Sequence, residues 1–151
     1  MLPYNISRSN VLPVAANDYM TIISNASRSF GIIELDFEGA GITSAYTEMG
    51  VYRVSAAGTT PGGAIVPTPV NPAQPAFGGV VDTTWSGQPT VSALIHTIPV
   101  NSNGQRYFWR AASNLFNAIW SPGGGAAAGT VSIRPITISG NITGRVQVVE
   151  I

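Results

Sequence analysis

Short stretches in which apolar and polar residues alternate recur along this chain of 151 residues. In the clearest one, Ile33, Leu35 and Phe37 point to one face and three carboxylates point to the other. Alternation with a period of two is typical of a β-strand that buries one face. Further strands are predicted over residues 18–23, 49–54, 80–85, 91–98, 106–111, 115–120, 130–134, 136–138 and 145–150.

Connections rich in Gly, Pro, Asn and Ser separate these stretches, and such residues favour turns. The Ser-Gly-Asn sequence at 139–141 predicts a turn that joins residues 136–138 and 145–150 as a C-terminal strand pair. Residues 114–119 fit at most one helical turn, and no longer window shows a capped helical pattern. The sequence therefore predicts an all-β single domain, an antiparallel β-sandwich or jelly roll with extended Pro/Gly loops.

Two segments fit this pattern less well. We assign the sandwich domain to residues 30–151 and leave residues 1–29 as an irregular N-terminal arm or a first strand, because Pro3 and Pro13 interrupt regular structure there. Residues 59–74 contain four prolines and almost no charge. They are interpreted either as a long surface loop or as an extended arm laid against a neighbouring subunit, since proline reduces the entropy lost on ordering.

Charge is scarce along the whole chain. Seven arginines and seven acidic residues make up 9% of the sequence, against about 25% in an ordinary soluble domain, and there is no lysine. Such a surface either stays soluble through Ser, Thr, Asn and Gln or is covered by other protein chains. The arginines are scattered singly, so nucleic acid is not an expected partner.

Several other classes of protein are excluded or not indicated. There is no cysteine, which excludes disulfides and thiolate metal sites. The first residues lack the pattern of a secretory signal, and no apolar run approaches the ~20 residues of a membrane-spanning helix. We therefore expect no membrane association and synthesis in the cytoplasm of the producing cell.

Candidate catalytic chemistry is sparse. The single histidine, His96, lies in a strand-like run and is interpreted as structural. Glu34, Asp36 and Glu38 alternate along one strand, a pattern compatible with calcium ligation or glycoside hydrolysis but more typical of a solvated face. Opposing arginines, Arg53 or Arg134, are expected to neutralise them. The Gly-Ala-Gly sequence at 39–41 and the three glycines at 123–125 lack the rest of a phosphate-binding motif. No catalytic residue, metal, cofactor or small-molecule substrate is predicted.

Aromatic residues gather in the second half of the chain, including Phe116. Over 106–110 both faces of the predicted strand are bulky, so both faces should be covered by protein. Trp and Arg are also enriched in the energetically dominant parts of interfaces. The predicted subunit or capsid interface comprises Arg53, Trp85, Tyr107, Phe108, Trp109, Arg110 and Trp120.

The order of motifs resembles that of small virion proteins of tailed bacteriophages. It comprises the acidic strand 34–39, the Val-Tyr-Arg strand at 49–53, the Pro/Thr-rich loop 58–69, the Thr-Trp-Ser segment at 81–86, and the closing strands 131–135 and 146–150. The resemblance covers about residues 30–151. It implies a β-sandwich capsid decoration (cement) protein, a homotrimer over the junctions between major capsid subunits, with no catalytic residue and no cofactor.

The expected partners are therefore the chain itself and the major capsid protein, and the expected location is the outer surface of the virion. Packed DNA pushes the shell outward, and each trimer would add buried interface across seams that would otherwise open. Arms that reach several shell subunits at once would strengthen binding by multivalency.

Three alternatives remain at the level of the sequence. The first is a trimeric receptor-binding or fibre-tip domain that binds host-surface glycans through Trp85, Trp109 and Trp120. The second is a tail-tube or connector component that forms rings. The third is a carboxylate-based glycosidase that uses Glu34, Asp36 or Glu38.

Overall fold

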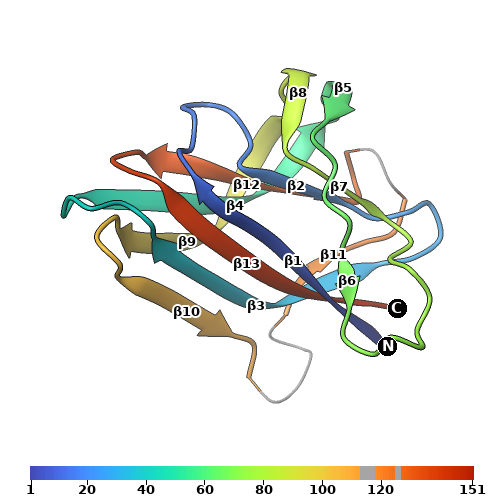
Figure 1. Cartoon of the computed structure of the whole chain (residues 1–151). Helices are drawn as coiled ribbons and strands as arrows, with labels where there is room; N and C mark the ends of the chain where they lie inside the picture. Colours follow the sequence, from blue (N-terminus) through green and yellow to red (C-terminus); the bar gives the residue numbers. More distant parts are fainter. Residues whose placement is uncertain (113–117, 125–126) are drawn as a thin grey trace.

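The chain forms a β-sandwich of two antiparallel sheets (Figure 1), and its computed structural model describes residues 1–112, 118–124 and 127–151. Sheet A has the order β10-β3-β13-β1-β6, with β11 also paired to β3. Its strands are β1 (Leu2–Val11), β3 (Phe30–Gly39), β6 (Thr68–Pro69), β10 (Arg106–Arg110), β11 (Ile119–Ser121) and β13 (Ile142–Glu150).

Sheet B has the order β7-β2-β12-β4-β9. Its strands are β2 (Met20–Ile23), β4 (Tyr46–Ala56), β7 (Val80–Asp82), β9 (Thr90–Asn101) and β12 (Thr130–Thr137). A separate two-stranded ribbon, β5 (Thr59–Gly62) with β8 (Thr84–Gly87), projects from the sandwich at the top of Figure 1. In the described parts of the chain there is no helix, and so none long and apolar enough to cross a membrane.

The predicted all-β sandwich is confirmed, and its wiring is that of a jelly roll. If the insertion between β4 and β9 is set aside, sheet A contains the order β1-β13-β3-β10 and sheet B the order β2-β12-β4-β9. Strands that follow one another along the chain therefore mostly lie in opposite sheets. A strand that buries one apolar face can then pack against its neighbour in sequence across the core rather than beside it.

The core is formed by the inward-facing positions of both sheets. Alternation explains these positions in β12, where Val131 and Ile133 face inward, and in β13, where Val146 and Val148 do. In β3, Leu35 and Phe37 are buried as predicted, but Ile33 is not part of the core and Ile32 takes that place. The reason is a β-bulge: the register between β3 and β13 shifts there and reverses which residue faces inward.

The predicted C-terminal strand pair is wrong. Residues 136 and 137 end β12, which pairs with β2 and β4 in sheet B, whereas β13 pairs with β1 and β3 in sheet A. The intervening residues cross from one sheet to the other. Ser139 holds this corner, because its hydroxyl donates to the Tyr46 carbonyl at 2.6 Å and its backbone N–H donates to Thr47 Oγ1 at 3.2 Å.

Two other predicted strands also differ from the structure. The strand predicted over 80–85 is divided, because β7 ends at Asp82 and β8 begins at Thr84 in the separate ribbon. Residues 113–117 lie outside the described part of the chain. They include part of the strand predicted over 115–120 and most of the alternative helical turn at 114–119. Phe116 is among them.

Residues 2–11 form β1, which lies between β13 and β6. Tyr4 and Ile6 are fully buried in it, and Asn5 between them is exposed. Asn10 has a positive φ of 53°, and the register with β13 shifts between Arg8 and Val11, so the strand is bulged near its end.

The second half of the proline-rich segment 59–74 packs against β1 of the same chain. Thr68 and Pro69 pair with β1, and the Val70 N–H and the Gln74 side-chain amide both donate to the Pro3 carbonyl. The segment thus adds β6 to one edge of sheet A and leads on to β7 at the edge of sheet B. At least this part is anchored within the same subunit.

Candidate functional site

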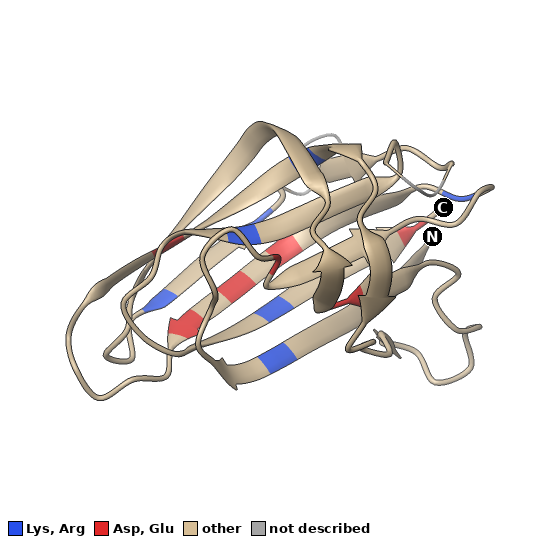
Figure 2. Ribbon diagram, turned by 90° about the horizontal axis from the view of Figure 1, so that it is seen from above, with Lys and Arg blue, Asp and Glu red and all other residues tan. Residues whose placement is uncertain are grey.

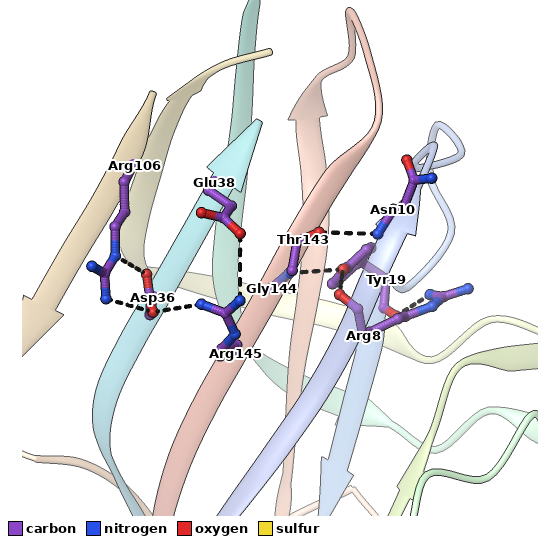
Figure 3. Close-up of polar contacts among 9 residues, drawn as sticks. All are labelled: Arg8, Asn10, Tyr19, Asp36, Glu38, Arg106, Thr143, Gly144 and Arg145. Carbon is purple, nitrogen blue, oxygen red and sulfur yellow. Dashed lines mark hydrogen bonds and ion pairs between the residues drawn. The ribbon is translucent and has the colours of Figure 1, made fainter. Parts of the chain in front are cut away.

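A row of ion pairs crosses the outer face of sheet A (Figure 2). Asp36 accepts two hydrogen bonds from Arg106, at 2.6 and 2.8 Å, and a third from Arg145 at 3.3 Å (Figure 3). We call this set the ionic ladder; it comprises Glu34, Asp36 and Glu38 of β3, Arg106 and Arg110 of β10, and Arg145 of β13.

The expectation that arginines neutralise the acidic strand is confirmed, but the two arginines named for it are wrong. Arg53 and Arg134 both lie in sheet B, whereas β3 is flanked in sheet A by β10 and β13. Arg134 pairs with Asp18 instead, at 2.6 Å. Arg53 Nη1 is buried and has no hydrogen-bond partner in the described structure. Strand order, which alternation does not specify, decides these pairings.

The ladder does not offer a free pair of carboxylates for acid–base chemistry. Hydrogen bonds from Arg106, and then the charges of Arg106 and Arg145, hold the pKa of Asp36 below its ordinary value. Glu34 and Glu38 are paired with Arg110 and Arg145. Within residues 1–112, 118–124 and 127–151, no group of three His, Cys, Asp or Glu side chains is placed to hold a metal ion.

A first prediction concerns the pH dependence of stability. The folded-state pKa of Asp36 is lowered, so its stabilising effect is present above the ordinary aspartate pKa of about 3.9 and is lost as the pH falls through the lower folded value. We expect Asp36→Asn to lower the urea midpoint at pH 7 and to flatten the loss of stability below about pH 4. An unchanged acid limb in this variant, measured by urea titration at several pH values, would contradict the assignment.

Outside the ladder, one long segment is nearly free of charge. Between Arg53 and Arg106 the only acidic or basic residue, apart from the neutral His96, is Asp82, which is buried. This segment supplies β6, β7 and β9, and therefore three of the four outermost strands of the two sheets; β10 is the fourth. Three of the four outermost strands thus carry almost no charge, whereas β10 carries Arg106 and Arg110.

One lateral edge of the sandwich is formed by β9 and β10, which follow one another along the chain and lie in opposite sheets. The twelve residues of β9 carry no carboxylate, lysine or arginine. Leu94 is 49% exposed there, and Ile95 on the same strand and Phe108 on β10 are also exposed. We call this surface the β9–β10 edge.

The opposite edge, which we call the β6–β7 edge, is also apolar. Val66 is 83% exposed, and Val70 and Val80 are exposed near it. A shallow cavity of about 200 Å³ opens here, and its walls include Ile65, Pro67, Phe77 and Val81. Both lateral edges therefore present apolar side chains to solvent.

The structure brings four of the seven predicted interface residues together on β10. Tyr107 and Trp109 point inward and pack against the core, whereas Phe108 points outward with the Arg106 guanidinium 5.4 Å from its ring. Arg110 belongs to the ionic ladder. The inward side also holds His96, whose Nε2 lies 2.7 Å from the Tyr107 hydroxyl and whose ring lies 5.2 Å from that of Trp109. Burial lowers the pKa of His96.

The other three predicted residues lie elsewhere. Trp85 is on β8 and its Nε1 donates to Thr21 Oγ1 at 2.9 Å. Trp120 is on β11, with its ring against Gly31, where an added Cβ would lie 2.9 Å away. Arg53 is in β4. The sequence alone did not identify Leu94 or Val66 as interface residues. For Leu94 a signal was present, because the adjacent apolar residues Leu94 and Ile95 place apolar side chains on both faces of β9.

Comparisons with models of protein families, with curated proteins and with solved structures find no match to this chain.

Proposed function

We propose that the protein is a structural virion protein of a tailed bacteriophage, a capsid decoration (cement) protein. In this proposal it forms a homotrimer and binds the outside of the shell made by the major capsid protein. The observation that carries the proposal is that three of the four outermost strands come from a segment whose only charged side chain is buried. The resemblance of the motif order to small phage virion proteins supports the same role.

The physical argument rests on how edge strands are normally protected. An outermost strand presents unpaired N–H and C=O groups, and monomeric proteins guard it with charges, prolines, bulges or a covering element. The twelve-residue β9 has one proline and bulges where it meets β4, but no charge, and exposed apolar side chains flank it. Burial of such an edge against another subunit is favourable, at about 25 cal/mol per Å² of apolar surface removed from water.

The ionic ladder, in contrast, suits a surface that stays in contact with water. Its charged groups are paired with one another, and they come from three neighbouring strands of sheet A, on which acidic and basic positions lie side by side (Figure 2). In a trimer joined through the lateral edges, this face would remain hydrated and would keep the assembly soluble. The three copies would then bind several shell subunits at once, and this multivalency would strengthen the attachment of the trimer to the shell.

The alternatives draw less support. The three tryptophans form no shared exposed platform, because Trp85 is tied to Thr21, Trp109 packs against the core and Trp120 lies on Gly31. A glycosidase would need a carboxylic acid and a carboxylate free to act, and the acids of β3 are paired with arginines.

The test is the mass of the protein in solution and its binding to expanded empty capsids. We expect three times the 15.7 kDa of one chain by light scattering. Leu94→Lys should place a charge on the β9–β10 edge and weaken trimer formation by at least about tenfold, equivalent to about 1.4 kcal/mol. It should also reduce binding to capsids.

Ile136→Lys provides the matched control. Ile136 is 43% exposed, a fraction similar to that of Leu94, but it lies on β12, an interior strand of sheet B that β4 separates from β9. We expect this variant to remain trimeric. A monomeric parent protein at about 100 μM, or equal effects of the two substitutions, would refute association through this edge.

A further inference from the structure

A cavity of about 250 Å³ lies outside both lateral edges. The loop between β1 and β2 forms one wall, and the residues from Thr83 to Gln88 form the other. Its polar and aromatic lining includes Arg8, Asp18, Tyr19, Trp85 and Gln88. The volume is below the roughly 300–1,000 Å³ typical of sites for drug-sized ligands, so it fits a molecule about the size of a single sugar ring.

Arg8 brings a positive charge to this cavity without a carboxylate to neutralise it. Its Nη1 donates to the Tyr19 carbonyl, and its guanidinium lies 4.8 Å from the centre of the Tyr19 ring (Figure 3). No ion pair joins Arg8 to any described acid. A guanidinium has five N–H donors, and among the described residues only the Tyr19 carbonyl accepts a hydrogen bond from that of Arg8. Burial lowers its pKa, as expected for a cation partly removed from water.

The one acid in the cavity is already engaged. Asp18 Oδ1 accepts from Ser132 at 2.6 Å and from Arg134 Nε at 2.8 Å, and Oδ2 accepts from Thr21 at 2.6 Å. Arg134 also balances its charge, with Nη2 2.6 Å from Oδ1. The cavity therefore keeps the uncompensated charge of Arg8 and favours an anion.

The remaining walls are held in place by the same network. Trp85 Nε1 donates to Thr21 Oγ1, which in turn donates to Asp18. Gln88 accepts the Asp18 backbone N–H at 2.9 Å through Oε1, which leaves its amide NH₂ as a donor. A site whose lining groups are fixed by buried neighbours loses little entropy when a ligand binds.

We propose that this cavity binds a saccharide unit that carries a carboxylate. The carboxylate is placed on the free N–H groups of Arg8, with the Gln88 amide as a second donor, and the apolar face of the pyranose ring lies against Trp85. Arginine matches a carboxylate with two parallel hydrogen bonds, and an aromatic wall with a few converging polar groups is typical of small-ligand sites. This inference goes beyond the proposed assembly role and does not depend on it.

Three small probes separate the contributions to binding. Glucuronate and glucose differ only in whether C6 is a carboxylate or a hydroxymethyl group, and acetate offers the carboxylate without the ring. In ligand-observed NMR titrations of the full chain, we expect glucuronate to bind at least about tenfold more tightly than glucose or acetate. Equal binding of glucuronate and glucose, or no binding of glucuronate at about 10 mM, would overturn the proposal.

Variants assign the effect to the cavity. Arg8→Gln should abolish the preference for glucuronate, and Arg110→Gln, which removes an arginine of the ionic ladder, should leave it unchanged. Asn17→Asp adds a negative charge at an exposed wall of the cavity without disturbing the buried network, since it is the Asn17 backbone that bonds to Val14. Asn17→Asp should weaken the binding of glucuronate but not that of glucose. It therefore tests the proposal even if Arg8→Gln does not fold. Retained preference in Asn17→Asp, or equal losses in Arg8→Gln and Arg110→Gln, would overturn the assignment.

Discussion

Replacement of Asp18 by asparagine is expected to lower the free energy of unfolding by about 3–5 kcal/mol, the range measured when one partner of a buried ion pair is removed. Asp18 is 3% exposed, and the Arg134 side chain that pairs with it is 13% exposed. Asparagine has nearly the same shape, so no cavity is created. Its neutral amide would leave the guanidinium uncompensated and would turn an NH₂ group toward donors from Thr21 or Ser132.

The measurement is urea unfolding at pH 7, followed by intrinsic fluorescence. Arg110→Gln is the comparison, because the Arg110 side chain is 64% exposed and ion pairs at the surface contribute about 0–1 kcal/mol. A loss of less than about 1 kcal/mol in Asp18→Asn would show that the network is not an energetic centre of the fold. The attachment of the β5–β8 ribbon should loosen in this variant too, since Trp85 reaches Asp18 through Thr21.

The second large effect is expected at the end of β3. A Cβ added to Gly39 would lie 2.1 Å from the Asn101 carbonyl oxygen and 2.5 Å from two backbone atoms of Ser102. Backbone atoms cannot rotate aside as a side chain can. Gly39→Ala should therefore destabilise the protein by roughly 3 kcal/mol, at the upper end of the range for overpacking.

Gly41→Ala is the control in the same loop, because its Cβ would meet nothing closer than the Ser102 carbonyl at 3.2 Å. We expect it to cost less than about 1 kcal/mol, measured by thermal and urea unfolding. Similar losses in both variants would mean that the loop is sensitive to any side chain, rather than to the approach of Gly39 to the corner between β9 and β10. In the proposed function, that corner supports the β9–β10 edge, so Gly39→Ala should also weaken trimer formation.

These predictions separate two parts of the surface that the low charge of the chain does not distinguish. The charged residues are concentrated in the ionic ladder and in buried pairs such as Asp18 with Arg134, whereas the outermost strands β6, β7 and β9 carry only the buried Asp82. Leu94 and Ile136 are exposed to a similar degree, but Leu94 lies on an outermost strand of sheet B and Ile136 on an interior one. The association experiment therefore tests strand edges rather than general hydrophobicity.

The sequence by itself determined the local structure. Period-two alternation correctly identified most β-strands and, in β3, the inward residues Leu35 and Phe37, because each strand must bury one face wherever it lies. It also indicated that the acids of β3 would be neutralised by arginines. It did not identify β5 and β6 within the proline-rich segment, and Pro3, which was expected to interrupt regular structure, lies within β1.

Which strands lie side by side was decided only by the tertiary structure. Arg106 and Arg145 flank Asp36, and β12 and β13 lie in opposite sheets, because the jelly roll places successive strands across the core from one another. The bulge that turns Ile33 away from the core, and the cavity beside Arg8, likewise depend on strands distant in sequence. Alternation is a property of one strand and its two faces, whereas register, edge and cavity are set by the packing of several strands, which no local pattern encodes.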